Sequence, residues 1–139
     1  MATITGTSTA DFIHRLGDGF GGGGLNEVTG VTAAADQISG DVGNDLIYAD
    51  AGNDTVNGND GYDTLVGGQG TDRVLGGVGN DTFRKLQLSD ISGLAETVNG
   101  GSDLDTLDFQ TFQASGAVDL TLATISDIET LLVFANDTR

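Results

Sequence analysis

The sequence contains no cysteine and no tryptophan, and it has a single histidine among its 139 residues. Without cysteine, disulfide scaffolds, thiol chemistry and thiolate metal sites are all excluded. One histidine leaves most zinc, haem and general-base arrangements without the side chains that they need. The H-E-x-x-H and G-x-S-x-G motifs of metalloproteases and serine hydrolases are missing as well. The sequence therefore predicts a protein that is not an enzyme.

Basic residues are scarce, because five lysines and arginines stand against 21 aspartates and glutamates and give a formal net charge of −16. Nucleic acids and anionic membranes attract proteins largely through lysine and arginine, so neither is expected as a partner. The longest apolar run, Leu131 to Ala135, has five residues, whereas a membrane span needs about 20. The first residues have no basic segment followed by an apolar one. We therefore expect neither membrane insertion nor a Sec-type leader.

Two residue types are abundant, aspartate and glycine. Of the 21 acidic residues 18 are aspartate, and 23 residues are glycine. So acidic a chain with few apolar side chains is close in composition to a disordered polyanion, and its charge has to be neutralised before it folds. Aspartate is favoured in turns and is a common ligand of hard cations. The composition therefore indicates a turn-rich chain that binds cations.

Aspartate recurs every nine residues between residues 31 and 84, at Asp36, Asp45, Asp54, Asp63, Asp72 and Asp81. Two places after each aspartate comes a large apolar residue: Ile38, Ile47, Val56, Leu65, Val74 and Phe83. Glycine stands two places before each aspartate except the first, where the residue is Ala34. The units fit, in whole or in part, the nonapeptide G-G-x-G-x-D-x-U-x, in which U is a large apolar residue. This pattern resembles the RTX, or haemolysin-type, calcium-binding repeat family.

Each unit has six turn-forming residues followed by three strand-forming residues. In a three-residue strand the middle side chain points to one face and its neighbours to the other. Alternating turns and short strands close one coil of a flattened solenoid every two units, or 18 residues, with the U side chains inside. We therefore expect an all-β fold, a right-handed parallel β-roll stacked by calcium, with a β-rich C-terminal cap.

The second position of each unit is expected to adopt a positive φ. Where it is not glycine it is Asp41, Asp50, Asn59 or Thr32. Aspartate and asparagine tolerate a positive φ better than other residues that carry a Cβ, whereas a β-branched threonine does not. The first unit, which contains Thr32 and no glycine, therefore departs most from the pattern.

Coiling places aspartates 18 residues apart above one another, with Asp45, Asp63 and Asp81 on one edge and Asp36, Asp54 and Asp72 on the other. These rows of like charge repel unless an oxygen-seeking divalent cation lies between successive turns. The family resemblance implies about four Ca²⁺ ions, held at the pairs Asp45–Asp63, Asp63–Asp81, Asp36–Asp54 and Asp54–Asp72. It also implies carbonyl ligands from Gly40, Val42, Gly43, Gly52, Gly58, Asp60, Gly61, Gly67, Gly70, Gly76 and Gly79.

We expect a single domain over residues 1–139. Residues 6–14 form a degenerate repeat with Asp11 and Ile13 in the two key positions, residues 14–30 a glycine-rich insertion, and residues 31–84 the six regular repeats. Residues 85–139 are interpreted as a capping region, in which residues 85–99 carry no repeat and residues 100–108 carry one further unit. Residues 118–122 and 129–134 are expected to be strands. The alternative for the second is a short helix opened by a capping box from Ser126 to Glu129.

On the outer face of one sheet, Leu46, Tyr48 and Val66 are expected to form an apolar cluster. Such a cluster in water is unfavourable, so we expect the cap, the insertion or a partner chain to cover it.

Together these patterns predict a non-catalytic calcium-binding β-roll module that folds when it binds extracellular Ca²⁺. The family resemblance implies a bacterial protein secreted through a type I channel, with other domains of a larger secreted protein as further candidate partners. The alternative is an accessory carbohydrate-binding or adhesion module of a secreted enzyme or adhesin. Threonines at Thr55, Thr64 and Thr82 give adhesion little support, because they are not expected to form a regular row on one face.

Overall fold

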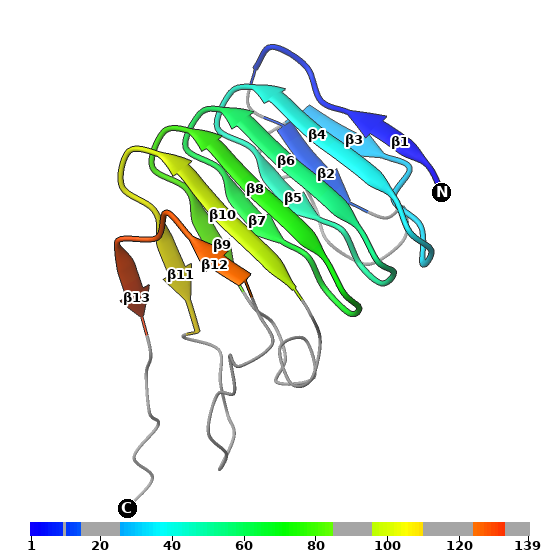
Figure 1. Cartoon of the computed structure of the whole chain (residues 1–139). Helices are drawn as coiled ribbons and strands as arrows, with labels where there is room; N and C mark the ends of the chain where they lie inside the picture. Colours follow the sequence, from blue (N-terminus) through cyan, green and yellow to red (C-terminus); the bar gives the residue numbers. More distant parts are fainter. Residues whose placement is uncertain (10, 15–25, 85–95, 110–123, 133–139) are drawn as a thin grey trace, which may run out of the picture.

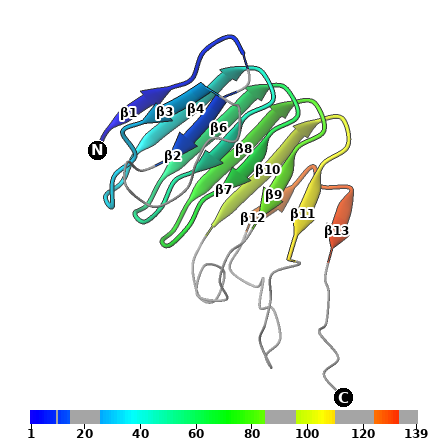
Figure 2. The same cartoon turned by 180° about the vertical axis from the view of Figure 1, so that it is seen from behind.

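The computed structural model describes residues 1–9, 11–14, 26–84, 96–109 and 124–132, in which every regular element is a β-strand. The strands form two parallel sheets that face each other along the roll (Figures 1 and 2). Sheet A contains, in spatial order, β1 (Thr3–Thr5), β4 (Gln37–Val42), β6 (Thr55–Asp60), β8 (Arg73–Val78), β10 (Thr97–Ser102) and β12 (Thr124–Ser126). Sheet B contains β13 (Thr130–Leu132), β11 (Thr106–Asp108), β9 (Thr82–Arg84), β7 (Thr64–Val66), β5 (Leu46–Tyr48), β2 (Asp11–His14) and β3 (Asn26–Thr29). This architecture confirms the predicted parallel β-roll. A search of these described residues for a helix that could span a membrane found none.

The strand register confirms that one coil takes 18 residues in the regular part of the roll. In sheet A, Ile38 pairs with Val56, which pairs in turn with Val74. In sheet B, each U residue likewise pairs with the U residue two units further on, as Ile47 does with Leu65. The chain therefore alternates between the sheets at every nonapeptide.

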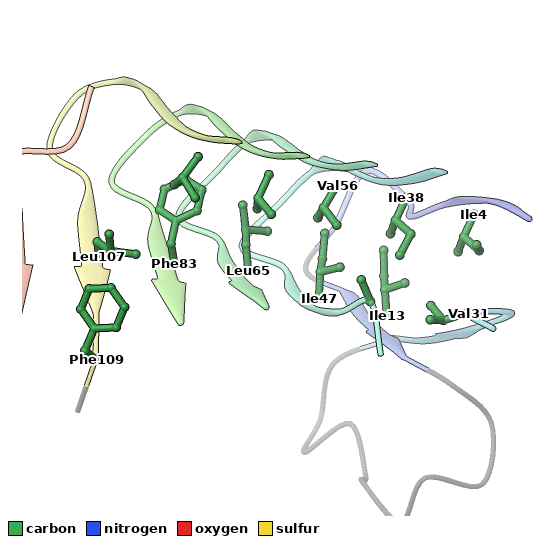
Figure 3. Close-up of a cluster of buried hydrophobic side chains, with 13 residues drawn as sticks. Ile4, Ile13, Val31, Ile38, Ile47, Val56, Leu65, Phe83, Leu107 and Phe109 are labelled. Atoms are coloured by element: carbon green, nitrogen blue, oxygen red, sulfur yellow. The ribbon is translucent and has the colours of Figure 1, made fainter. Parts of the chain in front are cut away.

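The U side chains form one continuous core between the sheets (Figure 3). All six U residues of the regular units are at most 3 % exposed. Ile4, Ile13, Val98 and Leu107 extend the same row beyond the regular units. Burying one such side chain stabilises the fold by roughly 1.5 to 3 kcal/mol, so this single row is the main apolar contribution to the roll.

The backbone at the second position of the regular units has the predicted conformation. Asp41, Asp50 and Asn59 have φ values of 80°, 71° and 78°, and glycines at the same position also have positive φ. Thr32 is not among the described residues with positive φ. The first unit therefore turns its chain differently, which becomes important at the metal centre.

The N-terminal end of the roll contains one strand that the sequence analysis missed. Phe12 in β2 pairs with Leu46 in β5, so 34 residues separate neighbours that are 18 apart elsewhere. The extra residues include β3, which pairs with β2 at the edge of sheet B. The interpretation of residues 14–30 as an insertion without strands was therefore wrong for residues 26–29. Residues 15–25 lie outside the described part of the chain.

The C-terminal end also continues the roll earlier than predicted. Val98 in β10 pairs with Val74 in β8, 24 positions away, so residues 96–99 belong to a repeat unit, contrary to the expectation for residues 85–99. Strand β13 confirms the strand expected within residues 129–134, and Asp127, with φ 53°, lies in the turn between β12 and β13. The alternative helix from Ser126 to Glu129 was therefore wrong. The strand expected at residues 118–122 lies outside the described residues.

The predicted apolar cluster on the outer face of sheet B is largely shielded from solvent. Val66 is 1 % exposed, and Leu46 and Tyr48 are partly buried. Phe12, 2 % exposed, joins the cluster and packs edge-on against Tyr48 with ring centroids 5.8 Å apart. The burial agrees with the expectation that this face is covered.

The outward threonines are more regular on sheet B than the sequence analysis expected. Thr64 and Thr82 are in register with each other, and the row continues through Thr106 and Thr130. Thr55, in contrast, lies on sheet A, in register with Arg73. A four-residue threonine row therefore exists on one face, although it does not include Thr55.

Candidate metal centre

The aspartates that precede the U residues stack in two columns, one on each edge of the roll. The long column consists of Asp11, Asp45, Asp63, Asp81 and Asp105, and the short column consists of Asp36, Asp54 and Asp72. Each of these side chains is at most 2 % exposed. The columns bring together all four aspartate pairs that the sequence analysis predicted.

Backbone hydrogen bonds hold each column together. The N–H of Asp45 donates to Oδ1 of Asp63 at 2.8 Å, and the N–H of Asp63 donates to Oδ1 of Asp81 at 2.8 Å. The same contact links the short column, where the N–H of Asp54 donates to Oδ1 of Asp72 at 2.9 Å. At the end of the long column, the N–H of Asp105 donates to Oε2 of Glu129 at 2.7 Å. One carboxylate oxygen of each linked acid is thus used to fix the stacking of the coils.

The second carboxylate oxygen has no hydrogen-bond partner in five of these aspartates. These buried Oδ2 atoms belong to Asp45, Asp54, Asp63, Asp81 and Asp105. A buried polar atom left without a partner costs about 1 to 3 kcal/mol, and more when it is charged. A row of such atoms therefore needs a ligand that supplies positive charge.

The environment of these carboxyls disfavours their ionisation. Burial raises the pKa of Asp54 to about 7, against the lowering effect of the hydrogen bond from the Asp36 N–H, and the neighbouring charge of Asp72 raises it further. Burial likewise raises the pKa of Asp81 to about 7 and that of Asp45 to about 6, and it raises the pKa of Asp63 as well. A bound cation would reverse this effect, because it stabilises the ionised carboxylate.

Backbone oxygens lie beside the unpartnered carboxylate oxygens. A Cβ added to Gly58 would come 2.6 Å from the carbonyl oxygen of Gly76 and would also collide with Oδ2 of Asp63. A Cβ on Gly40 would meet Oδ2 of Asp45 and would stand 2.7 Å from the carbonyl oxygen of Gly58. Glycine at this position therefore leaves room where a carboxylate and a carbonyl from successive turns converge.

The predicted carbonyl ligands all belong to the turns that lead into the columns. Gly40, Gly58, Gly67 and Gly76 open these turns, Val42 and Asp60 end strands β4 and β6, and Gly43, Gly52, Gly61, Gly70 and Gly79 stand two residues before an aspartate. A Cβ on Gly61 or Gly70 would collide with the carbonyl of the matching glycine one coil earlier. The carbonyl of Asp60 accepts a hydrogen bond from the Gly43 N–H at 2.8 Å, which uses one of its two lone pairs.

This donor set fits a hard divalent cation. In the described residues no group of three or more acidic or histidine side chains converges on one point. A cation between two turns would therefore take two carboxylates at most and complete its shell with carbonyl oxygens. Calcium accepts such mixed oxygen cages of six to eight ligands, which supports the fit.

Three acidic residues in the columns were absent from the predicted metal ligands. Asp105, 0 % exposed, extends the long column beyond Asp81, and Asp11 stands at its head. Glu96, 1 % exposed, precedes Val98 by two residues and thus occupies the aspartate position of its unit. The signal was an acidic residue two places before an apolar one, but it fell outside the nine-residue phase of the regular units.

Asp36, at the head of the short column, differs from the aspartates below it. Its Oδ2 accepts hydrogen bonds from the N–H and Oγ1 of Thr32, at 2.7 and 2.8 Å, and its Oδ1 accepts one from the Ala2 N–H. Although burial acts to raise the pKa of Asp36, these hydrogen bonds hold it below its usual value. Both oxygens are therefore engaged within the chain.

The stacked aspartates and the carbonyl-lined turns define a class of protein, the calcium-binding parallel β-rolls. A family model described as the RTX calcium-binding nonapeptide repeat (4 copies) matches residues 31–65 and 49–83. The repeat region of this chain belongs to the RTX calcium-binding nonapeptide repeat family, as the sequence predicted. No curated protein and no solved structure matched the chain.

Proposed function

We propose that the chain is a non-catalytic module whose coils are held together by Ca²⁺ ions bound between successive turns. The observation that carries this proposal is the row of buried Oδ2 atoms without partners in Asp45, Asp54, Asp63 and Asp81. Asp72, which stacks under Asp54, completes the short column. The carbonyl oxygens named in the preceding section would supply the remaining ligands. The site beyond the regular repeats, at Asp105, belongs to the same proposal.

Calcium suits these sites better than magnesium. Magnesium requires a small octahedral shell at about 2.0 to 2.1 Å and gives up its water reluctantly. Calcium accepts six to eight oxygens in a flexible arrangement, which matches single carboxylate oxygens and backbone carbonyls from two turns. A bound ion would also offset two of the 16 negative charges in excess. About four ions would thus remove half of the net charge that opposes coiling.

The proposal includes folding on binding. One U side chain contributes roughly 1.5 to 3 kcal/mol by burial, whereas ordering nine residues costs about 9 to 18 kcal/mol of backbone entropy. Backbone hydrogen bonds add only about 1 kcal/mol each. Without a cation the buried carboxylates make the balance worse. The free energy of calcium binding then becomes the free energy of folding.

We infer that this module works outside the cell, in a bacterial protein exported by a type I channel and joined there to other domains. A chain that folds only with calcium remains unfolded where calcium is scarce and folds where it is abundant. The RTX family to which the repeats belong supports this placement.

Far-UV circular dichroism during a Ca²⁺ titration tests the proposal, with Mg²⁺ as the control and a chelator for the starting state. We expect a cooperative change from coil to strand with calcium, at roughly 0.1 to 1 mM as in extracellular calcium modules, and no such change with magnesium. A spectrum already rich in strand in the chelator, unchanged by calcium, would contradict folding on binding.

A further inference from the structure

Both aspartate columns begin with an aspartate that is capped by a threonine four residues earlier. In the long column, the Thr7 N–H donates to Oδ2 of Asp11 and the Thr7 Oγ1 donates to Oδ1 at 3.0 Å. In the short column, the Thr32 N–H and Oγ1 both donate to Oδ2 of Asp36, at 2.7 and 2.8 Å. The two turns, which are unrelated in phase, thus share one local arrangement.

The threonines occupy the position at which the metal-binding turns have positive φ. The equivalent residues further along include Asp50 at 71°, Asn59 at 78° and Gly77 at 123°. Neither Thr7 nor Thr32 is among the described residues with positive φ, as expected for a β-branched side chain. The residue type at this position therefore separates turns in which the aspartate is capped from turns in which it has an unpartnered oxygen.

We propose that Thr7 and Thr32 take the place of a cation at the heads of the two columns, so that these turns bind no Ca²⁺ and are ordered without it. The amide and hydroxyl donors satisfy the carboxylates of Asp11 and Asp36, neither of which has an unpartnered buried oxygen within the described residues. Hydrogen bonds to a charged acceptor are worth about 1.5 to 3 kcal/mol each, so two of them offset a large part of the burial cost.

The position of the caps explains why they are needed. A cation is shared by two successive turns, and the first turn of a column has no acidic turn before it. Above Asp36 the chain has Ala2, which stands two residues before Ile4 in the place of an aspartate and offers only its N–H, donated to Oδ1 of Asp36 at 2.7 Å. A cation there would lack half of its shell, and threonine supplies donors instead.

The capped turns also prepare the first calcium-binding turns. The N–H of Asp11 donates to Oδ1 of Asp45 at 2.7 Å, and the N–H of Asp36 donates to Oδ1 of Asp54 at 2.8 Å. An ordered first coil thus holds the carboxylates of the next coil before any ion arrives. Calcium-driven folding of the roll then proceeds from the N-terminal end.

The inference rests on the proposed calcium sites, and a matched pair of variants tests it. Asp36→Asn and Asp54→Asn change two buried members of the same column, of which only Asp54 has an unpartnered oxygen. Calorimetric titration should find the unaltered number of ions per chain in Asp36→Asn and fewer in Asp54→Asn. Loss of an ion in Asp36→Asn would overturn the proposal.

Hydrogen exchange in chelator gives a second, independent readout. We expect amides in residues 31–42 to exchange at least tenfold more slowly than those in residues 55–84, and Thr32→Val to remove this difference. Thr64→Val is the control, because the Thr64 side chain makes no hydrogen bond within the described residues. Equal exchange rates in both segments of the unaltered protein would refute the inference. If that protein binds no Ca²⁺ at all, the proposed function fails, and the exchange rates alone decide on the threonine caps.

Discussion

Substitution of Asp63 tests the shared use of one carboxylate by two calcium sites. Asp63 stacks between Asp45 and Asp81 in the long column, and its Oδ2 has no hydrogen-bond partner. Asp63→Asn keeps the shape of the side chain and the Oδ1 acceptor for the Asp45 N–H but removes the charge. Asp63→Ala removes both. We expect both variants to need more calcium to fold, with alanine the more damaging.

The magnitude follows from what each variant loses. Asp63→Ala leaves the buried Asp45 N–H without its 2.8 Å acceptor, which costs about 1 to 3 kcal/mol. Both variants remove one charged ligand from two neighbouring sites, and each 1.4 kcal/mol of lost binding is a factor of ten in affinity. We therefore expect the calcium midpoint to rise at least tenfold for asparagine and roughly a hundredfold for alanine.

Circular dichroism titrations and calorimetric ion counts measure these effects. Asp60→Ala is the matched control, because it removes the same charge from an exposed side chain in the preceding turn and should shift the midpoint by less than about twofold. A midpoint for Asp63→Asn within twofold of the unaltered protein would refute the assignment of this carboxylate as a ligand.

Three further predictions concern pH, the turns and the core. Because burial raises the folded-state pKa of Asp54 and Asp81 to about 7, the calcium-free roll should be most stable below pH 4 and lose up to about 4 kcal/mol per carboxyl as the pH rises through 7; chelator-treated protein that unfolds on acidification from pH 8 to 5 would contradict this. Conversely, the calcium midpoint should rise as the pH falls below 7, because protons compete for the same oxygens. Gly58→Ala, which directs a Cβ at the Gly76 carbonyl, should cost about 1 to 3 kcal/mol and raise the calcium midpoint. Leu65→Ala should lower the free energy of unfolding in saturating calcium by about 2 to 5 kcal/mol, whereas Leu131→Ala, at a position already 55 % exposed, should cost less than half as much in urea titrations.

The regular part of the roll could be predicted from the sequence because its information is local. Each unit contains its own turn, its own strand and its own buried side chain, so the nine-residue period alone indicates the coil, the two sheets and the core. The positive φ of Asp50 and Asn59 was predictable for the same reason, since it follows from residue type. The four stacked aspartate pairs followed from the 18-residue coil.

The two ends could not be predicted in this way, because insertions shift the phase there. Asp11 reaches Asp45 across 34 residues, and Asp81 reaches Asp105 across 24, yet both pairs make the same hydrogen bond as the regular ones. What is preserved is the contact between coils, which depends on tertiary pairing and not on counting residues. A search for acidic residues two places before apolar ones, without a fixed period, would have found Glu96 as well.

The hydrogen bonds within the columns all run in one direction. In every linked pair the N–H belongs to the earlier coil and the carboxylate to the later one, from Asp11 through to Glu129. The two ends of the roll therefore have opposite chemical requirements: the first coil has to find donors for its carboxylates, and the last has to find an acceptor for its amide. Threonine meets the first requirement and Glu129 meets the second. Whole 18-residue coils could be inserted or removed between these ends without altering either, so the length of the module can vary while its two terminal coils remain the same.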